Sequence, residues 1–170
     1  MRESVPDSVA GRLQARWSAQ THDDWKRNLL SNRPYLTQEH LDRASAQMDR
    51  AIPGGLVTDH ESLIAGLTLP DPDDRHALAA AIRCNSSVIV TFNVKDFPVA
   101  ALEPFGIEAQ LPDVFIANLF DLDQAAVVAA ARRQRARLRN PPMDVERQDV
   151  LRRRGLVQTA KSLGIYQAIL

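Results

Sequence analysis

Residues 69–97 decide the fold, and they read LPDPDDRHALAAAIRCNSSVIVTFNVKDF. The stretch opens with an acidic turn that contains Asp71, Asp73 and Asp74, and an alanine-rich segment follows. Because aspartate caps the free amides of a helix and proline suits its first turn, we expect a helix to begin at Asp71. The apolar run VIVTF at residues 88–92 then predicts a central parallel strand that is buried on both faces.

Helical and strand patterns alternate on either side of this stretch. Upstream, we expect a helix capped by Thr21 and a second helix that begins at Thr37. The other expected elements are short helices at residues 6–15, 59–67 and 97–102, short strands at 56–57 and 107–110, and helices at 112–120, 123–139 and 145–155. Alternation of this kind predicts an α/β layer structure with right-handed crossovers.

The composition predicts one globular domain with a helical appendage. Of the 170 residues, 45% are hydrophobic, which is enough for one core. We expect a domain at residues 1–120 and a C-terminal helical extension at residues 121–170 that packs on the domain or on a partner. The sequence lacks an apolar run for a membrane span and the apolar core of a signal peptide, which predicts a cytoplasmic protein with no membrane partner. The single cysteine, Cys84, is expected to be a packing residue.

Charge is unevenly distributed, although the net charge is zero. Residues 1–120 contain 11 Lys and Arg against 16 Asp and Glu, a net of −5, whereas residues 121–170 contain 10 against 5, a net of +5. The basic tail carries Arg132, Arg133, Arg135, Arg137 and Arg139. Such a tail suits nucleic acid or an acidic partner, although a solvated helix face has the same pattern.

The loop after VIVTF is a candidate metal site. Ligands gather beyond the carboxyl ends of parallel strands, which is where Asn93 and Asp96 follow the predicted strand. If the preceding helix begins beside this loop, Asp74 approaches Asp96, and two carboxylates about 4 Å apart repel by about 4 kcal/mol at an effective dielectric constant near 20. A divalent cation relieves this repulsion. Carboxylate and amide oxygens suit Mg²⁺ or Mn²⁺, which commonly assist phosphodiester hydrolysis.

Each of these acids also has a purely structural interpretation. Negative charge in the first turn of a helix is stabilising by about 0.3 to 1 kcal/mol, which accounts for the acidic turn without any function. Asp24 suits the far end of a capping box, and Asp96 suits the N-cap of the following helix. His76 and Trp25 are interpreted as packing residues. The combination of acids is more specific than any one of them.

The segments LPDPDDRHALAAAI and VIVTFNVKDF resemble the third and fourth acidic motifs of the PIN domain family, in its branch of VapC-like toxin ribonucleases. The segments WSAQTHDDWKRNLLSNRP and GIEAQLPDVFIANLFDLD are also similar to that branch, so the resemblance covers residues 16–139. It implies a three-layer α/β/α fold with a short central parallel sheet, and an acidic cluster that binds Mg²⁺ or Mn²⁺ and cleaves RNA with a metal-activated water. It further implies site residues at Asp24, Asp74, Asp96, Asn93 and Thr91.

Carried over by position, the three aspartates of this set are the metal ligands, and Asn93 and Thr91 support them. Family members usually have glutamate at the position of Asp24. Members also open with a buried apolar strand that ends in a catalytic aspartate, whereas this chain begins MRESVPDSVAGRLQARWSAQ, and Asp7 follows Pro6 instead of an apolar run. The resemblance therefore implies a fold without its first strand and without one of four carboxylates, either through truncation or through degeneration.

Two hypotheses of different classes follow for the function. The first is a metal-dependent endoribonuclease of the toxin–antitoxin type with reduced activity, which hydrolyses RNA, pairs with a cognate antitoxin and forms a homodimer. The second is a noncatalytic module of the same fold that binds RNA or an antitoxin-like protein through the basic tail. A nonfunctional gene remnant is a third alternative.

Overall fold

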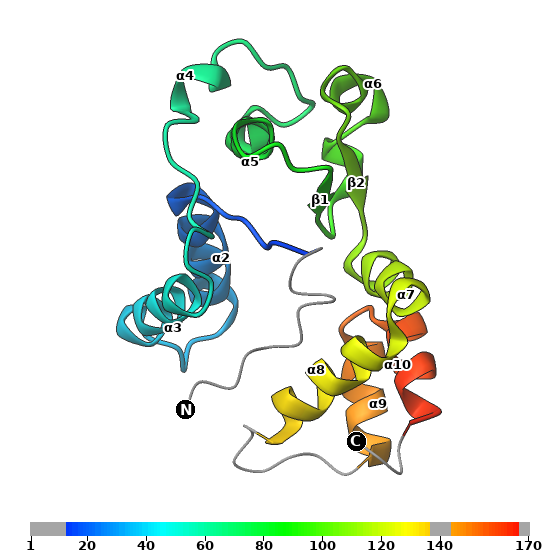
Figure 1. The fold of residues 1–170 in the computed structure, drawn as a ribbon. Coiled ribbons are helices and arrows are strands. Elements are labelled where there is room, and N and C mark those ends of the chain that lie inside the picture. Colours follow the sequence, from blue (N-terminus) through cyan, green and yellow to red (C-terminus); the bar gives the residue numbers. More distant parts are fainter. Residues whose placement is uncertain (1–12, 137–143, 167–170) are drawn as a thin grey trace. The chain divides into compact units, whose positions relative to one another are not determined.

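The computed structural model describes residues 13–136 and 144–166, which are mostly helical with one small two-stranded parallel sheet (Figure 1). The chain divides into two compact units. Of the described residues, the larger unit comprises residues 14–89 and 93–109, and the helical unit comprises residues 13, 90–92, 110–136 and 144–166. The chain is therefore mixed α/β, as expected. The three-layer arrangement and the domain boundary after residue 120 stay predictions.

Helix α2 (Ala19–Asn32) begins earlier than the sequence pattern indicates. Its N-cap is Ser18, whose hydroxyl accepts a hydrogen bond from the backbone N–H of Thr21 at 3.2 Å. The prediction that Thr21 caps this helix is therefore wrong. The cause is tertiary, because the backbone of Trp17 forms a parallel bridge with Leu56 and leaves the chain extended up to the helix start. This bridge is also what remains of the strand expected at residues 56–57.

Helix α3 (Gln38–Ala51) was expected to begin at Thr37, and Thr37 is its N-cap, whose side chain accepts a hydrogen bond from the backbone N–H of His40. Two polar contacts join it to α2, and the first is between Nζ of Lys26 and Oδ1 of Asp42 at 2.9 Å. The Oδ1 atom of Asp49 accepts hydrogen bonds from Nε1 of Trp17 at 2.7 Å and from Nε2 of His22 at 3.1 Å. The pairing of α2 with α3 therefore includes partly buried polar contacts.

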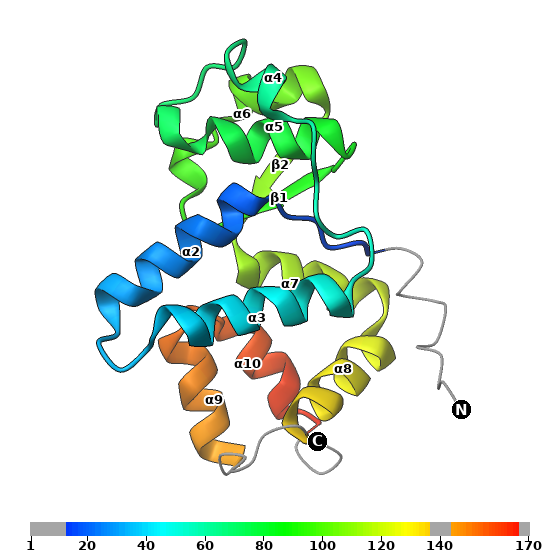
Figure 2. The same ribbon diagram turned by 90° about the vertical axis from the view of Figure 1, so that its left-hand side faces the viewer.

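The centre of the larger unit is helix α5 (Arg75–Arg83), which directly follows the 3₁₀ turn η1 (Pro72–Asp74). The short helix α4 (Glu61–Ile64) packs beside it (Figure 2). The core of this unit consists of Leu67, Leu69, Leu78, Ala79, Ala81, Phe97, Leu102 and Ile107. Alanine side chains allow neighbouring elements to approach the axis of α5 closely, so the alanine-rich sequence explains this packing.

Strand β1 (Val88–Val90) pairs in parallel with β2 (Glu108–Gln110), the edge strand that the sequence predicts. The prediction that residues 88–92 form a strand buried on both faces is wrong. The strand has three residues, and the side chains of Val90 and Phe92 are 44% and 68% exposed. Among the described residues β2 is the single strand that pairs with β1, so β1 has a paired strand on one side only.

Three short turns connect the two strands. They are the 3₁₀ turn η2 (Val94–Asp96), helix α6 (Val99–Leu102) and the 3₁₀ turn η3 (Glu103–Phe105). The helix expected at residues 97–102 is thus one turn long. Gly106 ends η3 in the left-handed region at φ 66°, which favours glycine and lets the chain enter β2.

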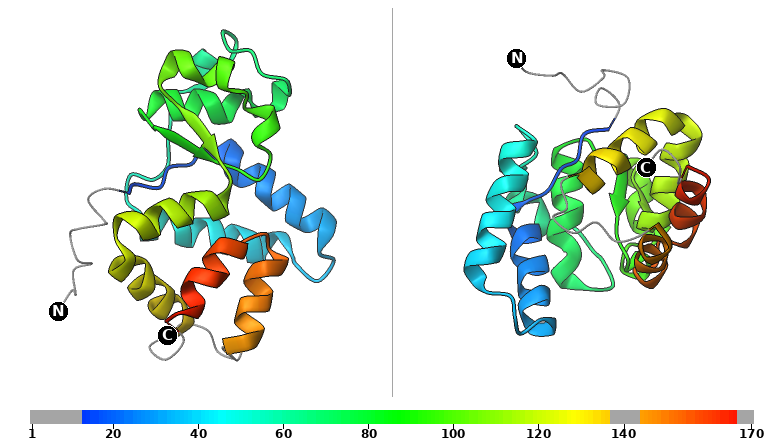
Figure 3. Two further views of the ribbon diagram at one scale, coloured as in Figure 1. Left: turned by 90° about the vertical axis from the view of Figure 1, so that its right-hand side faces the viewer. Right: turned by 90° about the horizontal axis from the view of Figure 1, so that it is seen from below.

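The helical unit contains four described helices around a small apolar core. They are α7 (Pro112–Leu122), α8 (Gln124–Ala136), α9 (Asp144–Arg153) and α10 (Val157–Gly164). Helix α10 packs against both α9 and α7 (Figure 3). Phe120, Val128 and Leu163 form the core between them. The helical character predicted for residues 112–120, 123–139 and 145–155 is confirmed where the structure describes these residues.

One buried carboxylate joins two of these helices. Asp113 in α7 accepts hydrogen bonds from the backbone N–H groups of Gln158 and Thr159 and from the hydroxyl of Thr159, all at 2.8 Å. It therefore caps the start of α10 from a position 45 residues away. Burial alone raises the pKa of Asp113, but these three donors outweigh it and hold the pKa below its ordinary value.

Some predictions fall on residues outside the described ranges. They concern most of the helix at residues 6–15, Asp7, and the tail residues Arg137 and Arg139. None of the described helices combines the length and the apolar character that a membrane crossing requires.

Candidate metal centre

The first part of the site is the turn that precedes α5. The Oδ1 atom of Asp71 accepts the backbone N–H of Asp73 at 2.9 Å, and Pro72 occupies the first position of the turn. This confirms Asp71 as the cap predicted from the sequence. Because the turn is tight, the residue at its end, Asp74, projects to the same side as Asp71.

The second part of the site is η2, which carries Asp96. The side-chain amide of Asn93 donates a hydrogen bond to Oδ2 of Asp96, and the backbone N–H of Asp96 donates to the carbonyl of Asn93 at 3.2 Å. Asp96 does not cap the following helix, which begins at Val99 after Pro98 and has no side-chain cap. Its carboxylate is therefore held by a local turn, and the structural interpretation as an N-cap is wrong.

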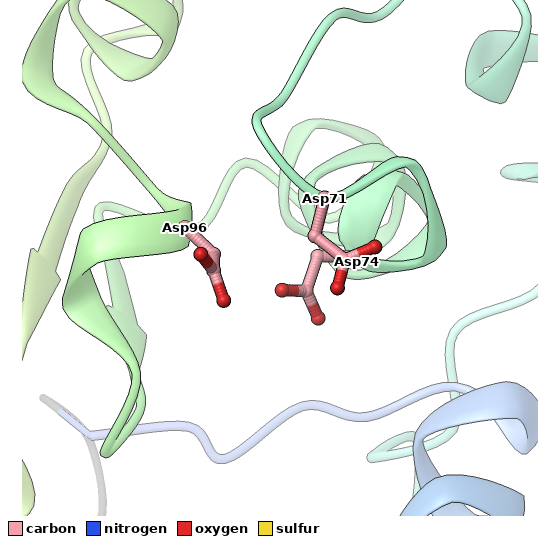
Figure 4. A group of neighbouring side chains, drawn as sticks. All are labelled: Asp71, Asp74 and Asp96. Carbon is pink, nitrogen blue, oxygen red and sulfur yellow. The ribbon is translucent and has the colours of Figure 1, made fainter.

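The core of the larger unit brings these two turns together. Leu78 in α5 and Phe97, directly after η2, belong to the same buried cluster. One oxygen from each of Asp71, Asp74 and Asp96 lies within 4.8 Å of the others (Figure 4). The three carboxylates point into a shared space between the start of α5 and η2 (Figure 4). The sequence predicted that Asp74 and Asp96 meet, and this pair is now joined by Asp71.

The electrostatics of the cluster are unfavourable in the absence of a cation. Partial burial raises the pKa of Asp74, and the neighbouring charges of Asp71 and Asp96 raise it further. His76 acts in the opposite direction, and Asp24 adds a smaller contribution that also raises the pKa. Asp74 is thus held among like charges that disfavour its ionised form.

The donor set fits a hard divalent cation. Three carboxylates from two turns supply oxygen ligands, and no described lysine or arginine forms an ion pair with Asp71, Asp74 or Asp96. Oxygen-rich sites of this kind suit Mg²⁺ or Mn²⁺, because these ions prefer carboxylates and retain several water ligands. The same carboxylates would hold the ion, and the side-chain amide of Asn93 would keep Asp96 in place.

Asp24, the other predicted ligand, lies beside the cluster with partners of its own. Its Oδ2 atom is 2.8 Å from Nε2 of His76, and its Oδ1 atom is 3.3 Å from Nη1 of Arg27. His76 is the second residue of α5, two positions after Asp74. Asp24 is therefore connected to the start of α5 through a buried histidine.

Thr91 belongs to the other compact unit. Its backbone N–H donates to the carbonyl of Gln110 at 3.0 Å, which continues the pairing of β1 with β2. Its predicted role in support of the site stays a prediction.

Asp71 is the site residue that sequence reasoning assigned only to capping. The signal was present in the spacing, since acids at positions i and i+3 of a helix start lie on one side of the turn. The segment DPDD contains such a pair in Asp71 and Asp74. One aspartate can cap a backbone N–H with one oxygen and face a cation with the other, so the two interpretations are compatible.

Comparisons with known proteins agree on one relative. Residues 112–164 match the family model of the VapC50 C-terminal domain. The chain is 43% identical over 81 residues to the protein named “Putative ribonuclease VapC50” of Mycobacterium tuberculosis strain H37Rv. The matched region covers 45% of this chain and 47% of that protein, so the chain spans about half the length of the relative. No solved structure matches the chain.

Both findings support the resemblance to VapC-like proteins. The family match covers α7, α8, α9 and α10, and the acidic cluster at residues 71–96 lies outside it. The family model thus shows similarity to the VapC50 C-terminal domain for residues 112–164.

Proposed function

We propose that this chain is a metal-dependent endoribonuclease of the toxin–antitoxin type, with its site at Asp71, Asp74 and Asp96. The observation that carries the proposal is the convergence of these three carboxylates within 4.8 Å from two separate turns. The similarity to a protein named as a ribonuclease supports RNA as the substrate. The proposal includes a cognate antitoxin as partner and activity below that of a site with four carboxylates.

The residues have distinct roles in this proposal. Asp71, Asp74 and Asp96 bind Mg²⁺ or Mn²⁺, and Asn93 orients Asp96 through its side-chain amide. A divalent ion at such a site activates a water molecule and stabilises the leaving oxygen of a phosphodiester. Asp74 is the most sensitive member, because its partial burial and its like-charged neighbours make it the acid that gains most from a bound cation.

The test is cleavage of RNA by the purified chain in the presence of Mn²⁺ or Mg²⁺, compared with cleavage in EDTA. We expect Asp74→Asn and Asp96→Asn each to reduce the rate at least tenfold, since removing a ligand weakens metal binding by about that factor or more. Asp73→Asn is the matched control, because Asp73 is exposed in the same turn and is outside the cluster. Its rate should stay within about twofold of wild type.

Equal cleavage by wild type, Asp74→Asn and Asp96→Asn would contradict the proposed nuclease. RNA binding without cleavage, with or without metal, would favour the noncatalytic module instead. Exposed arginines of the helical unit, namely Arg132, Arg133, Arg152, Arg153 and Arg154, are the observation that favours that second candidate. Calorimetric titration with Mn²⁺ alone separates the two, because a nuclease site takes up the metal itself.

A further inference from the structure

We propose that His76 is a positioning residue, which holds the carboxylate of Asp24 at the edge of the acidic cluster so that Asp24 contributes to cation binding. The inference rests on the proposed metal site. It concerns a residue that sequence reasoning interpreted as packing. The contact that carries the inference is the close approach of Nε2 of His76 to Oδ2 of Asp24, at 2.8 Å.

The two side chains of this contact differ in their burial. The imidazole is 10% exposed, whereas the Asp24 side chain is 47% exposed. The histidine is therefore the fixed partner, and the aspartate is the partner that would otherwise sample other rotamers. Helix α2, which carries Asp24, is in contact with α5, which carries His76.

The second ring nitrogen of His76 shows that packing alone does not explain this residue. Its Nδ1 atom is buried and has no hydrogen-bond partner among the described residues. A buried polar atom without a partner is unfavourable, and an apolar side chain of similar size would avoid that cost. The contact with Asp24 is thus the interaction that a leucine at this position would not reproduce.

The position of Asp24 connects this contact to the cluster. His76 follows Asp74 by two residues, so the imidazole is built on the same helix start as two of the three carboxylates. The charge of Asp24 is felt at Asp74, where it disfavours ionisation. A carboxylate at this place favours a cation and is suited to contact it through a water ligand, since Mg²⁺ retains several waters. Outer-shell partners of this kind typically change metal affinity about tenfold or more.

The experiment measures Mn²⁺ affinity from the electron paramagnetic resonance signal of the free ion, with folding checked by thermal melting. We expect His76→Leu to weaken binding about tenfold, and to melt at or above the wild-type temperature. We expect His76→Gln, whose side-chain N–H₂ reaches the place of Nε2, to bind within about twofold of wild type. His60→Leu is the matched control, because His60 is buried in the same unit and its Nδ1 likewise has no hydrogen-bond partner among the described residues.

A further comparison tests whether His76 acts through Asp24. In an Asp24→Asn background, which alone should weaken binding about tenfold, His76→Leu should cause no additional loss. Wild-type affinity in His76→Leu or in Asp24→Asn overturns the inference, as does equal weakening by His76→Gln and His76→Leu. If one of these outcomes overturns the inference but Asp74→Asn still loses Mn²⁺ binding in the same experiment, the proposed function stands without the role of His76. If the wild-type chain takes up no Mn²⁺, the proposed function and the inference fall together.

Discussion

At the scale of the residue, the ionised form of Asp74 suits a bound cation but lowers the stability of the metal-free protein. Its pKa is raised by burial and by the neighbouring carboxylates, so the folded state binds a proton more tightly than the unfolded state does. Protonated Asp74 therefore contributes its full stabilisation below the ordinary aspartate pKa of 3.8, and this stabilisation is lost as the pH rises through the raised pKa of the folded state. Near neutral pH and without metal, ionised Asp74 destabilises the protein.

Asp74→Asn should consequently stabilise the metal-free protein at pH 7. We expect an increase in the free energy of unfolding of up to about 1 kcal/mol, since solvent screens a half-buried group. Urea denaturation in EDTA at pH 7 and at pH 3.5 measures it, and the gain should shrink at the lower pH. Asp73→Asn is again the control. A loss of stability in Asp74→Asn at pH 7 would mean that the carboxylate makes a favourable contact, contrary to the raised pKa.

At the scale of the element, the attachment of α10 to α7 depends on one buried side chain. Asp113 accepts three hydrogen bonds at the start of α10, and these donors lower its pKa although burial opposes them. A lowered folded pKa contributes stability above the ordinary value of 3.8 and loses it as the pH falls through the folded pKa. The packing of α10 is therefore expected to be acid-sensitive.

Asp113→Asn should destabilise the protein by about 2–4 kcal/mol at pH 7. The substitution removes the charge and turns an amide group toward the N–H groups of Gln158 and Thr159, and hydrogen bonds to charged groups are worth about 1.5–3 kcal/mol. Denaturation monitored by helical circular dichroism measures the change. Asp121→Asn, on the exposed part of the same helix, should stay within about 0.5 kcal/mol of wild type. Equal effects of the two substitutions would contradict the capping role of Asp113.

At the scale of the whole molecule, the proposed ligands and the buried cap belong to different compact units. Asp71, Asp74 and Asp96 lie in the larger unit, whereas Asp113 and α10 lie in the helical unit. A ligand that binds only the folded state stabilises it by about 2.7 kcal/mol at a free concentration of 100 times its Kd. A bound cation is therefore expected to stabilise the larger unit, which contains the three carboxylates, more than the helical unit.

Mn²⁺ should therefore protect one unit from hydrogen exchange more than the other. We expect amides at residues 69–89 and 93–97 to exchange up to about 100-fold more slowly with saturating Mn²⁺, and amides of α10 to change little. Mass spectrometry of peptic peptides measures both regions in one sample. The protection should disappear in Asp74→Asn. Equal protection of both regions would show that the two units unfold as one.

Local features of the fold could be predicted because their causes lie within a few residues. The cap of Asp71 on the turn before α5 and the cap of Thr37 on α3 each join neighbours in sequence. The edge strand at residues 108–110 and the helix that begins at Pro112 were also expected. The approach of Asp74 to Asp96 was predicted on the condition that the helix begins beside the loop after the strand, and the structure meets that condition.

The sequence by itself determined the acidic turn, with Asp71 and Asp74 on one side of it, and the helix α5 that follows. Tertiary structure decided that this pair meets Asp96, that His76 contacts Asp24, that β1 is short and exposed, and that Asp113 caps a helix 45 residues away. The physical reason is the distance along the sequence between the residues that interact. Caps and turns depend on hydrogen bonds between near neighbours, whereas these other contacts depend on which distant elements the core brings together.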